Sequence, residues 1–150
     1  MNESLQRAAR EVREQCICTK LRQASRAVTQ HYDAVMAGSG VRATQIVLLV
    51  ALAQAPEVPL SKLAEVLVMD RTTLTRNLAP LIRDGLAKEH AMADARVKTF
   101  ALTARGAKVL EEALPAWKKA QNQILRALDP KDVDALGRLL DLLIGTTRPA

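Results

Sequence analysis

The sequence is poor in aromatic residues and in cysteine, and it has no long apolar run. It holds one Phe, one Trp and one Tyr, so an apolar core has to be built from Leu, Val, Ile and Ala. The longest uninterrupted apolar run, residues 46–53, is much too short to cross a bilayer. Residues 1–15 are dense in charge, which is unlike a secretory signal. We therefore expect a cytoplasmic protein without a membrane partner.

Motifs that carry catalysis are also missing. The sequence has no Gly-rich phosphate loop, no Gly-x-Ser-x-Gly and no His-Glu-x-x-His. The cysteines and histidines share no metal-ligand spacing, and they stand at Cys16, Cys18, His31 and His90. Two cysteines do not make a disulfide framework. We expect neither an enzyme nor a bound metal or cofactor.

Positive charge is concentrated in the middle of the chain. The net charge is +6 and the pI is about 9.7. Residues 61–108 carry nine Lys and Arg against five Asp and Glu, residues 1–60 carry seven against five, and residues 109–150 carry six of each. This balance permits a polyanionic partner and places it at the middle segment.

The first part of the chain predicts two helices. Residues 4–36 carry apolar side chains mostly at three- and four-residue steps, which predicts one long helix ended by Gly38 to Gly40. Residues 43–54 are apolar nearly all round, which predicts a central buried helix. Residues 55–59 contain two prolines and break the chain.

The last part predicts two further helices. Residues 104–128 predict a helix capped by Thr103 and kinked at Pro115. Asp129-Pro130 is a start signal for the final helix, whose apolar stripe ends at Gly145. The apolar faces at both ends of the chain exceed what one small domain covers, so we expect them to pack against a second copy.

The middle of the chain predicts two short helices joined by a turn, followed by two strands. Residues 61–67 and the segment from Asp70 to Leu86 are separated by three or so residues, which is a helix-turn-helix arrangement. The period then changes to that of strands at residues 87–92 and 98–102, with a polar loop at 93–97.

The second of these helices has two contrasting faces. Its apolar face is formed by Leu74, Leu78, Leu81 and Ile82. Thr72, Arg76 and Arg83 project from the opposite face, with Thr73 and Asn77 at its flank. Asp70 is the expected N-cap and Gly85 the stop signal. The outward side chains suit the DNA major groove, although an ordinary amphipathic surface helix is the alternative.

This order of elements is that of a winged helix, and its details resemble the multiple-antibiotic-resistance regulator (MarR) family. The resemblance covers nearly the whole chain and implies a mainly α fold with a small β wing, in one domain over residues 1–150. The fragments that resemble the family are residues 45–49 in its second helix, 72–76 and 81–86 in its helix-turn-helix, and 94–96 and 102–106 at its wing.

The resemblance further implies a winged helix-turn-helix lobe over residues 43–113 and dimerisation helices over residues 1–38 and 114–148. Family members are homodimeric regulators that bind pseudo-palindromic double-stranded DNA through recognition helices and wings. We expect a repressor that a small-molecule effector releases from its operator, with Asp94 holding the wing loop rather than touching DNA. The residues expected to make up the DNA-binding site, with Asp94 counted for its support of the wing loop, are Arg71, Thr72, Thr73, Arg76, Asn77, Asp94, Arg96 and Lys98.

Three positions depart from the family pattern. Val68 stands where the turn usually has Gly, and a β-branched residue resists a positive φ, so an altered turn is expected. Pro80 cannot donate a hydrogen bond to Arg76 and is expected to bend the recognition helix. Residues 92–93 are Met and Ala where the family often has Arg, which predicts a less basic wing.

The two cysteines allow two interpretations. On a continuous helix the side chains of Cys16 and Cys18 diverge by about 200°, so they cannot bond to each other without unwinding. One interpretation is that they pack as small apolar side chains. The other is a redox-sensing regulator, which acts either through a disulfide to another subunit or like the branch of the family that senses hydroperoxides through a cysteine early in its first helix. In that branch a tyrosine of the second helix tunes the thiol, and this second helix has none.

Overall fold

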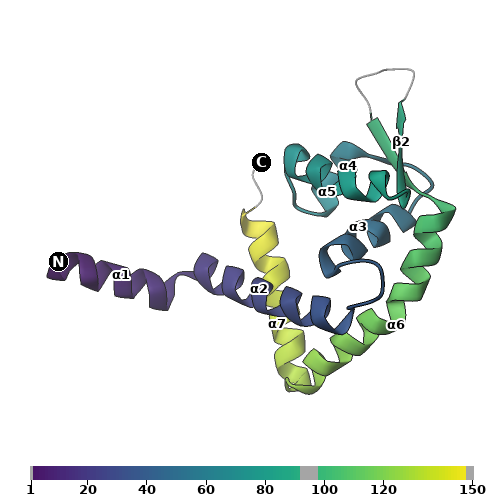
Figure 1. Ribbon diagram of the computed structural model, residues 1–150. Helices are drawn as coiled ribbons and strands as arrows, with labels where there is room; N and C mark the ends of the chain where they lie inside the picture. The colour runs from purple at the N-terminus through teal and green to yellow at the C-terminus, as the bar shows by residue number, and fades with distance from the viewer. Residues whose placement is uncertain (1, 92–97, 148–150) are drawn as a thin grey trace.

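Helices make up most of the fold, and a small antiparallel sheet lies at one end of it (Figure 1). The computed structural model describes residues 2–91 and 98–147. The expected mainly α fold with a small β wing is confirmed. In chain order the elements are α1 (Glu3–Gln15), α2 (Ile17–Val35), α3 (Ala43–Ala53), β1 (Val58–Pro59), α4 (Leu60–Val66), α5 (Arg71–Arg83), β2 (Ala87–Ala91), β3 (Lys98–Leu102), α6 (Ala104–Arg126) and α7 (Pro130–Thr147).

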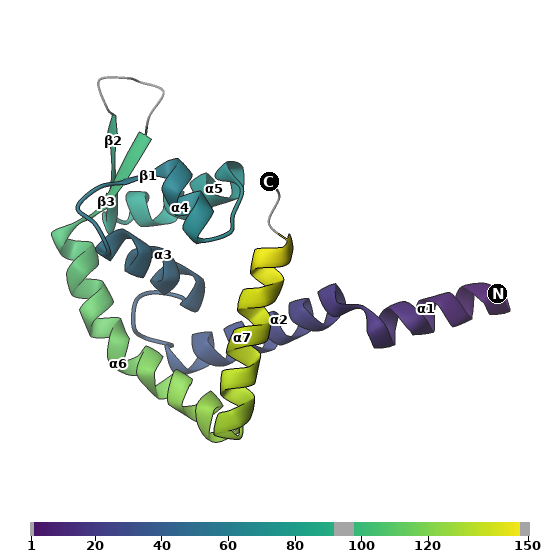
Figure 2. The ribbon, with the colours of Figure 1, turned by 180° about the vertical axis from the view of Figure 1, so that it is seen from behind.

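The helices divide between one lobe, which is α3, α4 and α5 with the sheet, and the arms, which are α1, α2, α6 and α7. Helices α3, α4 and α5 pack with the sheet, and α6 leads from the wing to the far side of the molecule (Figure 1). Helix α1 extends away from the rest of the chain, and α7 turns back from the end of α6 toward the lobe (Figure 2). Among the described residues, no helix combines the length and apolar character that a bilayer crossing requires.

The core of the lobe is aliphatic around a single aromatic ring. Phe100 of β3 is 1% exposed and packs with leucines of α3, α4 and α5. Helix α3 buries four side chains, but Val47 and Val50 are 49% and 40% exposed. The expectation that this helix is buried nearly all round is therefore wrong, because the lobe covers only one of its faces.

The expected single helix over residues 4–36 is also wrong. Cys16 has φ −70° and ψ 107°, an extended conformation that ends α1 and begins α2. The segment Cys-Ile-Cys-Thr holds β-branched residues and cysteines, all of which have low helix propensity. The break therefore falls where the chain gains least from continuing the helix.

A strand that the sequence did not reveal completes the sheet. β1 pairs with β3 through Val58 opposite Phe100 and Pro59 opposite Thr99, giving the strand order β1-β3-β2. Residues 55–59 are therefore more than a chain break. Pro59 is tolerated because β1 is an edge strand, where a missing amide donor interrupts no ladder.

Helix α7 does not end at Gly145, as was expected, but continues to Thr147. In this last turn the hydroxyl groups of Thr146 and Thr147 donate hydrogen bonds of 2.7 Å to the carbonyl oxygens of Leu142 and Leu143. Helix α6 was expected to kink at Pro115. It continues through Pro115 as one helix and bends along its length (Figure 2).

Two helices of the helix-turn-helix end in the same left-handed motif. Gly85, after α5, has φ 69°, and the Leu86 amide donates to the Leu81 carbonyl at 2.8 Å. Val68, after α4, has φ 51°, and the Met69 amide donates to the Ala64 carbonyl at 2.9 Å. The turn thus keeps the geometry that suits glycine, and the expectation of an altered turn is wrong.

Gly106 permits a close approach between α6 and the start of the wing. A Cβ atom at this position would lie 2.0 Å from the Leu86 carbonyl oxygen. The Gly106 amide donates to the Thr103 hydroxyl oxygen at 2.9 Å, so Thr103 caps α6 as expected. The same hydroxyl donates to the Gly85 carbonyl at 2.7 Å and fixes the end of α5 to the start of α6.

Replacing Val68 by Gly is expected to raise the free energy of unfolding by about 0.5–1 kcal/mol. Left-handed backbone costs a residue with a Cβ roughly 1–2 kcal/mol, and the larger entropy loss of glycine offsets part of the relief. Urea denaturation followed by circular dichroism measures the difference. Val66→Gly is the matched control, because Val66 is equally exposed but lies within α4, where glycine destabilises. If the Val68→Gly protein is no more stable than the parent, the left-handed backbone of Val68 is not strained.

Candidate nucleic-acid interface

Helix α5 is fixed at its start by its N-cap, as expected. The Asp70 carboxylate accepts a hydrogen bond of 2.8 Å from the Thr73 amide and one of 2.6 Å from the Thr73 hydroxyl. The Thr73 hydroxyl and amide hold the pKa of Asp70 below its ordinary value. The Thr73 hydroxyl therefore donates its hydrogen bond to the Asp70 carboxylate. The methyl group and the lone pairs of the hydroxyl oxygen remain available for contact with a partner.

The orientation of α5 is set by its apolar face. Leu74, Leu78 and Leu81 are each 0% exposed. Thr72 and Arg76 lie on the exposed side, as the helical pattern predicted, and Arg71 is exposed as well. In the described part of the chain, these three side chains form no ion pair and no side-chain hydrogen bond. The exposed side of α5 thus presents two uncompensated guanidinium groups and a free hydroxyl.

The far half of α5 is less available. Asn77 is half-buried and its amide nitrogen lies 3.8 Å from the Met69 sulfur. Arg83 pairs with Asp84 at 2.9 Å, which lowers the pKa of Asp84 and raises that of Arg83. The charge of Arg83 is thus partly compensated, and we assign this residue no base contact.

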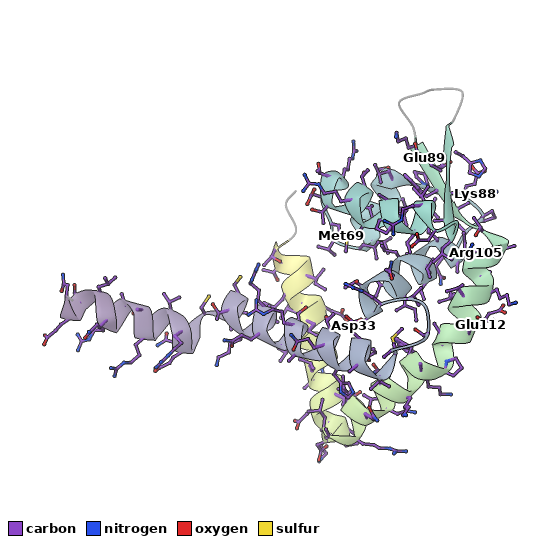
Figure 3. The ribbon with its side chains drawn as sticks, in the orientation of Figure 1. Asp33, Met69, Lys88, Glu89, Arg105 and Glu112 are labelled. Carbon is purple, nitrogen blue, oxygen red and sulfur yellow. The ribbon has the colours of Figure 1, made fainter. Side chains whose placement is uncertain are left out.

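The wing is described only at its base. Strand β3 pairs with β2 from Ala87 opposite Leu102 to Ala91 opposite Lys98. The Lys98 ammonium lies 2.7 Å from the Glu89 carboxylate, so its charge is compensated within the wing. Figure 3 shows Glu89 and Lys88 on this part of the sheet. The remaining expected wing residues, Asp94 and Arg96, lie outside the described residues.

A cleft that sequence reasoning missed lies between α3 and α5. Its volume is about 360 Å³. Arg42 contributes to it from the residue before α3 and is the only Lys or Arg between Arg26 and Lys62, a signal that the sequence did contain. The residues that line it are Arg42, Thr44, Gln45, Leu48, Arg76, Asn77, Pro80 and Arg83.

A carboxylate of α2 holds the start of α3 in place. The Ala43 amide donates to the Asp33 carboxylate at 2.8 Å, and Figure 3 shows Asp33 on α2 facing this region. The Arg42 amide donates to the Gln45 side-chain oxygen at 2.9 Å. These two bonds satisfy the amides of Arg42 and Ala43 and fix the backbone at the start of α3.

The cysteines lie apart from this interface, in the N-terminal arm. Both are free thiols; Cys16 is half-buried and Cys18 is exposed. The hydroxyl and amide of Thr19 lower the pKa of the Cys16 thiol below its ordinary value. Within the described ranges, no group of three His, Cys, Asp or Glu side chains is arranged to hold a metal ion.

Comparisons with known proteins agree with the fold and its exposed helix. The family model named MarR family matches residues 41–97. No curated protein matches the chain. A crystal structure of the M. tuberculosis transcriptional regulator MosR in complex with DNA is 33% identical, with 89% of this chain and 100% of that chain covered and a TM-score of 0.78.

Two other crystal structures are similar over most of the chain. A probable transcriptional regulator from Pseudomonas aeruginosa is 27% identical, with coverage of 87% and 98% and a TM-score of 0.77. Sco3205, a MarR family transcriptional regulator from Streptomyces coelicolor in complex with DNA, is 24% identical, with coverage of 92% and 93% and a TM-score of 0.79. The winged-helix fold, the matched family model and the identity to MosR over nearly the whole chain together show that this chain belongs to the MarR family of DNA-binding transcriptional regulators.

Proposed function

We propose that this protein is a homodimeric, sequence-specific repressor that binds a pseudo-palindromic operator and is released by a small-molecule effector. The observation that carries the proposal is the exposed side of α5, where Arg71, Thr72 and Arg76 face outward above three fully buried leucines. Arg is suited to guanine and to phosphate, and Thr to phosphate or a thymine methyl group. The similarity to MosR in complex with DNA supports this role. We propose the cytoplasm as its location.

The apolar surface of the arms supports a homodimer. Helices α1, α2 and α7 have no buried residue. These helices and α6 carry exposed large apolar side chains, and apolar side chains gathered at a surface are typical of protein–protein interfaces. We propose that a second copy covers them. The large apolar residues concerned include Leu5, Val12, Ile17, Leu21, Leu114, Leu125, Leu136, Leu139, Leu142 and Ile144.

A second cavity supports control by a small apolar effector. It has a volume of about 310 Å³ and lies between the arms and the lobe, with walls from α2, α3 and α6. Its lining combines apolar side chains such as Val47 and Trp117 with the hydroxyl groups of Tyr32 and Thr44. Tyr32 donates a hydrogen bond to Gln121, and its burial raises the pKa of the phenol. A mostly apolar site with a few hydroxyl groups suits a small organic molecule.

The second candidate function is thiol-based redox sensing. The hydrogen bonds from Thr19 lower the pKa of Cys16, a shift toward the thiolate, which is the reactive form. Cys16 is extended and not helical. The argument that helix geometry turns the side chains of Cys16 and Cys18 apart therefore does not apply. In this function the thiolate attacks the O–O bond of a hydroperoxide, which leaves a sulfenic acid on Cys16 and an alcohol as leaving group.

Arg76→Ala is expected to weaken operator binding about 10- to 100-fold, because one bidentate Arg contact contributes about 1–3 kcal/mol of discrimination. The operator is first selected from genomic DNA with the purified protein, and affinity is then measured by fluorescence anisotropy. Lys119→Ala, an exposed change on α6, should bind as the parent does. Sedimentation should give a dimer for all three proteins. Unchanged affinity of Arg76→Ala, or a monomeric parent, would count against the proposal.

An effector that dissociates the operator complex is expected to change the emission of Trp117, the only tryptophan of the chain. Small apolar molecules are screened for both effects. Val47→Phe fills part of the cavity and should keep operator affinity while losing the response to the effector. Val50→Phe, an exposed change on the same helix outside the cavity, should keep both. An effector that acts equally on Val47→Phe would place its site elsewhere.

If the redox function holds, an organic hydroperoxide should release the parent protein from its operator but leave Cys16→Ser bound. Cys18→Ser is the matched control, because Cys18 is two residues away and the pKa of Cys16 is the one that Thr19 lowers. Anisotropy before and after oxidation measures the release. Equal release of Cys16→Ser and the parent excludes Cys16 as the sensor.

A further inference from the structure

We propose that the cleft between α3 and α5 holds a phosphate of the DNA backbone, and that Arg42 and Thr44 contact the duplex beside the recognition helix. The inference rests on the proposed DNA-binding function and extends it to a part of the chain outside α5 and the wing. We call the site the arginine cleft, and its lining comes from the start of α3 and from one flank of α5.

The charge of the arginine cleft is strongly one-sided. Three arginines line it, Arg42, Arg76 and Arg83, and none of the described residues that line it is Asp or Glu. Arg83 pairs with Asp84 at 2.9 Å. In the described part of the chain, Arg42 and Arg76 have no ion pair. Two uncompensated cations that face one space of about 360 Å³ make a site for an anion.

Two further residues of the lining offer hydrogen-bond donors. Thr44 offers a hydroxyl group, and Gln45 keeps its amide nitrogen because only its oxygen accepts from the Arg42 backbone. The apolar lining is limited to Leu48 and Pro80. This is the opposite of the cavity between α2, α3 and α6, whose lining is mainly apolar. The arginine cleft therefore suits a phosphate and does not suit an apolar effector.

The position of Arg76 favours a backbone phosphate over a free anion. Arg76 lies on the exposed side of α5 and also lines the arginine cleft, so the cleft opens beside the side chains that would read bases. The backbone of Arg42 is held there by the bonds that the Ala43 amide donates to Asp33 and the Arg42 amide donates to Gln45. A cation on a fixed backbone next to a reading helix positions the duplex without reading its sequence.

Arg42→Gln tests the inference. On the operator and on a random-sequence duplex, affinity at about 0.15 M salt should fall by the same factor, on the order of 3- to 10-fold. The slope of log K against log salt should decrease in magnitude by about 1, because one phosphate contact is lost. Arg42→Lys keeps the charge and should keep the slope. Arg126→Gln removes an equivalent exposed charge on α6 and should change neither quantity.

Several outcomes would overturn the inference. An Arg42→Gln protein with parental affinity and slope excludes the phosphate contact. The inference is also wrong if Arg42→Gln keeps the salt dependence of DNA binding but no longer binds inorganic phosphate in calorimetry. That result would indicate a site for a free anion. Circular dichroism establishes that the variant is folded, and Thr44→Val supplies a second, smaller loss of affinity on both duplexes. If the parent protein itself shows no operator preference, the proposed function fails instead.

Discussion

The burial of one leucine face determines how the exposed side of α5 is presented. Leu74, Leu78 and Leu81 are fully buried, and each contributes about 1.5–3 kcal/mol by leaving water. A rotation of α5 about its axis would expose them, so their packing fixes the direction in which Thr72 and Arg76 point. The Asp70 cap fixes the start of the helix and the left-handed Gly85 its end. The chemistry of the exposed face therefore depends on side chains that never reach solvent.

Local signals in the sequence were enough to predict this helix. Its N-cap, its apolar face and its stop all lie within the 16 residues from Asp70 to Gly85. The N-cap of α6, Thr103, is likewise next in sequence to the helix that it caps. The two wing strands follow from a change of period, although the tip of the wing, with Asp94 and Arg96, lies outside the described residues. These features are set by neighbours along the chain, which a sequence pattern records directly.

Features set by distant contacts could not be predicted in this way. Strand β1 has two residues, one of them Pro59, and exists only because β3 lies beside it. The arginine cleft brings Arg42 next to Arg83, which are far apart in sequence, and neither position is unusual by itself. At Val68 the pattern identified the residue but not the outcome: the hydrogen bonds of the turn outweigh the strain of a left-handed valine. The break at Cys16 follows from propensity, which the strong apolar period of residues 4–36 concealed.

The exposed apolar surfaces of the arms make the stability of the proposed homodimer depend on its concentration. Helices α1, α2 and α7 bury no residue within the described chain, so they gain apolar burial chiefly by association. In the proposed homodimer, folding of the arms and pairing of the subunits form a single equilibrium governed by mass action, and the thermal midpoint rises with the amount of protein. In a cell with few copies, the abundance of the protein would itself determine how much of it is competent to bind.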